Sequence, residues 1–249
     1  MATEIVLTPD WPAPLNVKAV STTRQGGFSQ APFDSMNVGT HVGDDASVVK
    51  KNRDQLKQLI HLPNSPLWLE QVHGTDVIHT SSWKKSSQAD AIYSDQPNHV
   101  CAIMTADCLP VLFTDRQGTQ VAAAHAGWRG LLNGVLENTV SQFTGAREDI
   151  LVWLGPAIGP TQFEVGQEVY AAFTAYSQDA KQAFKVSDQT HYLADIYLLA
   201  KQRLSALGIT QIYGGDFCTV TEKQRFFSYR RDGITGRMVS LIWIVANKV

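Results

Sequence analysis

The stretch VCAIMTADCLPVLFTDRQGTQVAAAHAGWRG, residues 100–130, decides the fold. It contains three short apolar runs, at 100–104, 111–115 and 119–125, which a proline and a glutamine–glycine turn separate. We expect these runs to be strands of a buried sheet. Because no helix lies between them, a regular doubly wound sheet is disfavoured. The sequence therefore predicts the α+β class.

Helical and strand patterns flank this stretch on both sides. Residues 131–143 repeat apolar side chains at every fourth position, which is the period of a helix. Residues 47–60 place apolar side chains on one helical face, and the preceding pair Asp44 and Asp45 suits a helix N-terminus. We expect two further helices at 164–176 and 193–207, and strands at 150–154, 209–213 and 238–245.

Composition and charge exclude several classes of protein. Of 249 residues, 44% are hydrophobic and 18% are charged, which indicates a folded chain, and we expect one domain over 1–249. A formal net charge of −2 gives no cationic field that would recruit nucleic acid or a membrane surface. No segment approaches the roughly 20 apolar residues of a membrane-spanning helix. The three cysteines and the lack of a signal-peptide pattern predict free thiols and a cytoplasmic location, and no protein partner is implied.

Three residues carry metal-ligand chemistry at the predicted ends of elements: His73 in EQVHGTD, Cys108 in TADCLP and His125 in AAAHAGWRG. Two imidazoles and a thiolate suit zinc, and three protein ligands leave one position open for water or substrate. A structural zinc site would need a fourth ligand, and the sequence offers no convincing one nearby. We expect the other cysteines to be core residues and the other histidines to be solvated: Cys101 and Cys218, and His41, His61, His79, His99 and His191.

Glycine-interrupted polar segments are candidates for anion binding. In STTRQGGFS, residues 21–29, Arg24 precedes a double glycine, so that backbone amides and a guanidinium can approach one anion together. The segment FFSYRRDGITGRM, residues 226–238, adds Arg230 and two further arginines, although a solvated turn is the simpler explanation of this segment. A third such loop, at 36–45, contains Asn37. No segment forms a P-loop or a dinucleotide fingerprint.

Six motifs, in their order along the chain, resemble those of one known family: QVHG, ADAIYSDQ, TADCLPVLF, AAAHAGWRGL, LGPAIGPTQFEVG and FFSYRRDGITGRM. This family has long been described as multicopper polyphenol oxidase, or laccase-like, and later as zinc-dependent purine nucleoside phosphorylase and adenosine deaminase. The similarity extends from about Ser21 to Trp243. Copper oxidases need several histidine-rich copper centres, which seven scattered histidines do not supply.

The resemblance implies a four-layered mixed α/β fold and a metal held at the positions of His73, Cys108 and His125. It implies phosphorolysis of adenosine, inosine, guanosine and methylthioadenosine to the free base and ribose 1-phosphate, and deamination of adenosine. Purine nucleosides and inorganic phosphate are then the ligands. Arg24 and Asn37 match an arginine and an asparagine of the family, and are implied to contact phosphate or ribose.

Two alternatives to this function stay open. Some bacterial members of the family are described as hydrolysing an amide in peptidoglycan precursors, and an amidase would use Cys108 as its nucleophile. A non-enzymatic, zinc-stabilised binding protein would instead show a fourth ligand. For deamination, an activated water attacks C6 of adenine and a carboxylate shuttles protons. Asp107 is the candidate beside the catalytic pair Cys108 and His125, provided that the strand has ended before it, since neighbouring strand residues point to opposite faces.

Overall fold

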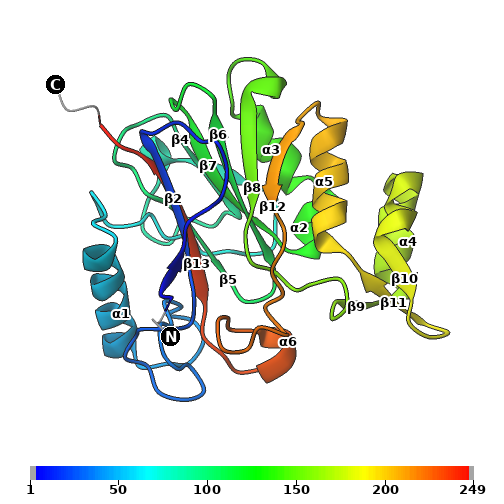
Figure 1. The fold of residues 1–249 in the computed structure, drawn as a ribbon, viewed down its shortest axis with the longest axis horizontal. Coiled ribbons are helices and arrows are strands. Elements are labelled where there is room, and N and C mark those ends of the chain that lie inside the picture. The colour runs from blue at the N-terminus through cyan, green and yellow to red at the C-terminus, as the bar shows by residue number, and fades with distance from the viewer. Residues whose placement is uncertain (1–3, 247–249) are drawn as a thin grey trace.

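Two sheets stacked face to face form the centre of the computed structural model, which describes residues 4–246 (Figure 1). The first sheet is antiparallel, in the order β1 (Val6–Leu7), β2 (Val17–Thr22), β13 (Met238–Ile244) and β5 (Cys101–Thr105). The second sheet is mixed, in the order β12 (Gln211–Gly214), β8 (Ile150–Leu154), β6 (Leu109–Asp115), β7 (Val121–Ala126), β4 (Ala91–Ser94) and β3 (Val77–His79). The chain crosses from the first sheet to the second between β5 and β6.

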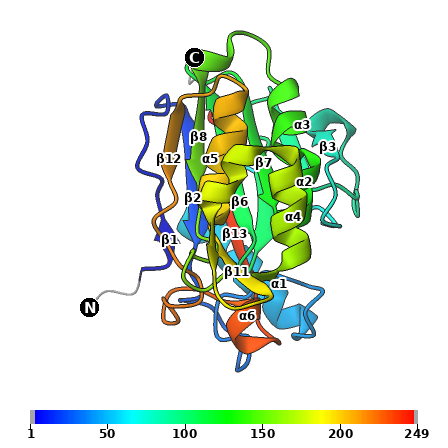
Figure 2. The same cartoon turned by 90° about the vertical axis from the view of Figure 1, so that its right-hand side faces the viewer.

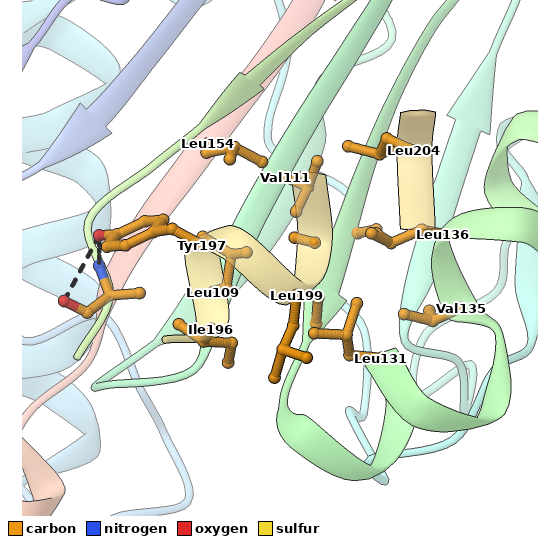
Figure 3. Packing of buried hydrophobic residues seen from close by; sticks show 14 of the residues in the cluster. Leu109, Val111, Leu131, Val135, Leu136, Leu154, Ile196, Tyr197, Leu199 and Leu204 are labelled. Atoms are coloured by element: carbon orange, nitrogen blue, oxygen red, sulfur yellow. Dashed lines mark hydrogen bonds between the residues drawn. The ribbon is translucent and has the colours of Figure 1, made fainter. Parts of the chain in front are cut away.

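Alternating side chains of the second sheet build the core on both of its faces. In β7, Val121 and Ala123 face the first sheet, whereas Ala122 and Ala124 face a cluster formed with the helices. This is the two-residue period of a strand that is buried on both sides. The helices on that face are α2 (Trp128–Asn133), α3 (Val135–Ser141) and α5 (Ile196–Ala206), which Figure 2 views from the front. Figure 3 shows leucines of these helices packed against β6.

The outer face of the first sheet is covered by α1 (Ala46–Leu59), whose Leu56 is buried against Val239 and Leu241 of β13. The layers therefore follow the order helix, sheet, sheet, helices, as the family resemblance implied. A third, small sheet of β10 (Phe184–Val186), β11 (His191–Ala194) and β9 (Glu164–Gly166) lies with α4 (Gln167–Tyr176) beside this stack. No helix between residues 4 and 246 is long and apolar enough to cross a bilayer.

Three helix predictions need correction at their ends. The helix expected at 131–143 begins earlier and is broken into α2 and α3 at Gly134, which has a left-handed φ of 103° that ends α2. The helices expected at 164–176 and 193–207 each begin with residues of a strand, β9 and β11, and become helical only at Gln167 and Ile196. The predicted helix at 47–60 is confirmed, and Asp45 caps it by accepting hydrogen bonds from the backbone amides of Ser47 and Val48.

The strand predictions hold, with differences in bounds and in pairing. The three predicted runs correspond to β5, β6 and β7, but β6 begins at Leu109, so that Pro110 lies inside the strand, and β7 begins only at Val121. In addition, β5 belongs to the first sheet whereas β6 and β7 belong to the second. All three cysteines are free thiols, as expected. Cys101 is a core residue, whereas Cys218 is only half-buried because it lies in a loop after β12.

Candidate metal centre

Strand register brings Cys108 and His125 together. Leu109 of β6 lies opposite Ala126 of β7, so Cys108, one residue before β6, reaches the end of β7 where His125 lies. His125 lies two residues after Ala123 in β7, so its side chain is on the same face of the strand, which faces the first sheet. Both functional groups therefore lie at one end of the space between the two sheets, where the chain crosses from β5 to β6.

His73 is supplied by the loop before β3, and a buried carboxylate holds that loop in place. Asp90, the residue before β4, accepts hydrogen bonds from three consecutive backbone amides: Val72 at 3.1 Å, His73 at 2.9 Å and Gly74 at 2.6 Å. His73 itself has a left-handed φ of 60°, which non-glycine residues rarely adopt. The carboxylate thus stabilises the strained turn that carries His73.

The same carboxylate orients His125. Oδ1 of Asp90 lies 2.7 Å from Nδ1 of His125, and the backbone carbonyl of Asp90 accepts the His125 amide at 2.7 Å. With Nδ1 bonded in this way, Nε2 is the nitrogen left to face a metal. Asp90 is fully buried, and burial would raise the pKa of its carboxyl, but the bonds from His125 and from the loop amides lower that pKa below its ordinary value.

The three predicted ligands form a cluster that fits zinc. Their ligand atoms all lie within 4.8 Å of one another, with Sγ of Cys108 at 4.0 Å from Nε2 of His73. This is the one such cluster of histidine, cysteine and carboxylate groups found between residues 4 and 246. Because the cluster has three members, an ion held there would keep an open coordination position. Gly127 leaves space beside two of the ligands. A Cβ at this position would lie only 3.1 Å from Sγ of Cys108 and 3.1 Å from Cδ2 of His73.

The electrostatics of the site couple Cys108 to the two histidines. Burial would raise the pKa of the Cys108 thiol, but the facing imidazoles of His125 and His73 lower it to about 6. Burial would lower the pKa of His125, but the Cys108 thiolate and Asp90 raise it to about 9. Both shifts favour a thiolate beside an imidazolium when no metal is bound. Such a thiolate is reactive, whereas a thiolate bound to zinc is shielded.

We therefore expect iodoacetamide to label Cys108 slowly in zinc-loaded protein and rapidly after chelation. In chelated protein the rate should fall as the pH drops through about 6, because the thiol then protonates, whereas an ordinary thiol loses its reactivity near pH 8.5. Mass spectrometry of the Cys108 peptide measures the rate, and the buried Cys101 serves as an internal control. Rapid labelling without chelator would instead favour a free nucleophile, as in the amidase alternative.

Asp107 lies in the turn between β5 and β6, with a positive φ of 92°. The strand has therefore ended at this residue, as a role in the site requires. However, both carboxylate oxygens are already bonded: Oδ1 accepts from the hydroxyl of Thr219 at 2.6 Å, and Oδ2 from the backbone amide of Arg230 at 2.6 Å. Asp107 thus ties the ligand-bearing turn to α6 (Tyr229–Asp232). Its role as a proton shuttle stays a prediction, and it requires one of these bonds to exchange.

Arg24 and Asn37 lie in neighbouring loops, and both have internal partners. The guanidinium of Arg24 pairs with the carboxylate of Asp34 at 3.2 Å and stacks over Phe227, so an anion would have to compete with Asp34. The buried amide of Asn37 accepts the backbone N–H of Arg237 at 2.9 Å and donates to nearby loop groups. Asn37 therefore fixes the start of β13 to this loop.

Arg230 and Arg237 differ in their positions relative to the turn that carries Asp107 and Cys108. The side chain of Arg230 is exposed, and only its backbone amide contacts Asp107. Arg237 precedes Met238, which pairs with Thr105 at the end of β5, and it therefore lies beside the turn that carries Cys108. Arg237 lies in the segment 226–238 that the sequence indicated, but nothing in the sequence distinguished it from the other arginines of this segment.

Asp90 is the functional residue that the sequence analysis missed. It lies in the motif ADAIYSDQ, and an acidic residue directly before an apolar strand was the available signal. The motif was used only as part of the family resemblance. The pairing of β4 with β7, in which Ala91 lies opposite Ala124, is what places Asp90 next to His125.

Comparison with known proteins decides the family. The family model described as multi-copper polyphenol oxidoreductase laccase matches residues 18–245. The chain belongs to this family. A purine nucleoside phosphorylase of Escherichia coli, YfiH, is 57% identical over 96% of this chain and 99% of its own length, and one of Pseudomonas aeruginosa is 54% identical over 96% and 98%.

Solved structures give the same result for the fold. A Neisseria meningitidis protein is 49% identical and superposes with a TM-score of 0.94 over 97% of this chain and 100% of its own. YlmD of Geobacillus stearothermophilus is 31% identical, with a TM-score of 0.93 over 99% and 98%. The mixed α+β architecture is therefore that of the family.

Proposed function

We propose that this protein is a zinc-dependent purine nucleoside phosphorylase. Its substrates are adenosine, inosine, guanosine and methylthioadenosine, which it cleaves with inorganic phosphate, and it also deaminates adenosine. The cluster of His73, Cys108 and His125 supports this proposal most directly, because a three-ligand site is typical of catalytic zinc. The names of the similar proteins support the phosphorylase part. A cytoplasmic location stays a prediction.

The proposal favours zinc over copper. A multicopper oxidase needs several copper centres, including one of the His₂Cys type near a histidine-rich cluster. Between residues 4 and 246, only one cluster of potential metal ligands is found, and it consists of two imidazoles and one thiolate. This donor set suits a single zinc ion, as it did in the sequence analysis.

Residues around the candidate metal centre have separate roles in this proposal. Asp90 bonds Nδ1 of His125, so that Nε2 is the nitrogen turned toward a metal, and Asp90 also holds the loop of His73. Zinc held by His73, Cys108 and His125 would supply a Lewis acid. Tyr229 is 60% exposed beside Arg230, and the guanidinium of Arg237 lies 6.0 Å from the centre of its ring. The roles of Asp107 in proton transfer and of Arg24, Asn37 and Arg230 in substrate contact stay predictions.

Product analysis tests this function. Zinc-loaded protein incubated with adenosine and phosphate should form adenine and ribose 1-phosphate, and also inosine and ammonia by the second activity. Leaving out phosphate should abolish the first pair of products but not the second, because only phosphorolysis consumes phosphate. Chromatography of the bases, with an ammonia assay, measures both. If neither pair forms with fully loaded protein, the proposed function is wrong.

A further inference from the structure

The structure points to an anion subsite formed by Arg53, Arg237 and His41. This subsite lies beside the candidate metal centre. Its ligand is a phosphate dianion, either inorganic phosphate or the phosphoryl group of ribose 1-phosphate. This inference rests on the proposed function and deepens it, because it moves the phosphate contact away from Arg24. It is carried by the positions and the unpaired charge of the two arginines.

Arg53 projects from α1 toward the loop that precedes this helix. Its Nε and Nη2 donate to the backbone carbonyl of Val38 at 2.9 and 2.7 Å, and its guanidinium stacks over Trp68 at 3.8 Å. Nη2 also lies 3.9 Å from Sδ of Met104 in β5. The guanidinium is thus held rigidly near the end of the strand that leads to Cys108, and its Nη1 has no partner among residues 4–246.

Arg237 approaches the same loop from the other side. Its backbone carbonyl accepts the amide of Val38 at 3.2 Å, and its Cγ lies against Gly39, where a Cβ would be only 2.8 Å away. Nη1 donates to the carbonyls of the preceding turn at 3.0 Å, whereas Nε and Nη2 donate to no group within residues 4–246. Val38 is therefore a shared neighbour of both arginines.

His41 completes the group. It follows Gly39 by two residues in the same loop, and the charges of Arg237 and Arg53, after desolvation, lower the pKa of its imidazole. The charge of Cys108 is also felt at Arg237, where it raises the pKa against the lowering effect of burial. The contacts of Val38, Met104 and Met238 place the two arginines near the turn that carries Cys108, and His41 belongs to the same loop as Val38.

Charge separates this group from Arg24. Neither Arg53 nor Arg237 forms an ion pair within residues 4–246, whereas Arg24 pairs with Asp34. Two acidic side chains of this region have other partners: Asp107, whose charge acts on Arg237, accepts from a hydroxyl and a backbone amide, and Asp44 accepts from hydroxyl and amide groups. Two half-buried guanidiniums without a carboxylate partner suit an anion, since partly buried charges normally find a partner.

Titration of inorganic phosphate into zinc-loaded protein, followed by calorimetry, tests the subsite without any turnover. Arg237→Met and Arg53→Met keep the apolar stem and remove the charge, and each should weaken phosphate binding by about 10- to 100-fold, because charge-assisted hydrogen bonds contribute roughly 1.5–3 kcal/mol. His41→Gln, in an exposed position, should weaken it a few-fold without any effect on folding. Arg116→Met, which removes an exposed arginine paired with Asp149, is the matched control and should bind phosphate normally.

Several outcomes decide the matter. Ribose 1-phosphate should compete with phosphate in the wild type and lose this ability in Arg237→Met. If Arg24→Met abolishes phosphate binding while Arg237→Met and His41→Gln leave it unchanged, the subsite is at Arg24 and the inference is wrong. If chloride displaces phosphate at equal concentration, the arginines bind anions without specificity, and the inference is also wrong. Phosphate binding that depends on Arg237 in a protein without phosphorolysis would refute the proposed function and leave the subsite standing.

Discussion

Cys108→Ala is expected to remove most of the bound zinc, and His125→Ala to do the same. Wild-type protein should hold about one zinc per chain, because the cluster has three ligands and one open position. Deleting one of three ligands leaves two donors, which hold the ion far more weakly. Both reactions of the proposed function should then fall below detection. Elemental analysis after dialysis against a weak chelator measures the zinc, and circular dichroism establishes that the variants are folded.

Cys218→Ala is the matched control for this experiment. Cys218 is also a half-buried free thiol, but its Sγ accepts a hydrogen bond from the amide of Gly159 and does not belong to the cluster. The control should therefore retain its zinc. Full retention of zinc in Cys108→Ala and His125→Ala would exclude the assigned ligands.

Much of the candidate site could be predicted from the sequence because its ligands lie at the ends of strands. His125 ends an apolar run and Cys108 precedes a proline, and these local signals, with the family motifs, were enough to select them. Zinc stays a prediction from the chemistry of the donors. The four-layered fold came from the resemblance, since periodicity alone gave elements but not their pairing.

Pairing between distant segments is what the sequence did not reveal. Asp90 contacts His125 only because β4 pairs with β7, and Arg237 reaches the site only because β13 pairs with β5. The pairing of Arg24 with Asp34 was likewise invisible, although it changes how available this arginine is. Gly134 shows the same limit on a smaller scale, because a helical period continues through a glycine whose φ breaks the helix.

Asp90→Asn is expected to weaken zinc binding by about 10- to 100-fold, the usual effect of losing a carboxylate that orients a metal-bound histidine. The reason lies in how the four donors share the two oxygens. Oδ1 accepts from His73 and His125, and Oδ2 from the two amides that flank His73. If the asparagine NH₂ faces His125, the imidazole must accept at Nδ1 and carry its proton on Nε2, which then cannot bind the metal. If the NH₂ faces the loop amides, two donors lose their acceptor and the turn of His73 is destabilised.

Asp115→Asn separates this effect from a general loss of stability. Asp115 is also buried, and its oxygens accept from the backbone amides of Thr119 and Gln120 and from the side chains of both residues. It lies at the other end of β6, roughly 20 Å from Cys108 at the rise of a strand. Both variants should lower the melting temperature, because each sets an NH₂ group against N–H donors, but only Asp90→Asn should lose affinity in a competition titration with a chromophoric chelator. Cobalt-loaded Asp90→Asn should also show a changed ligand-field spectrum. Equal losses of zinc affinity in the two variants would mean that Asp90 acts through stability alone and does not position the ligands.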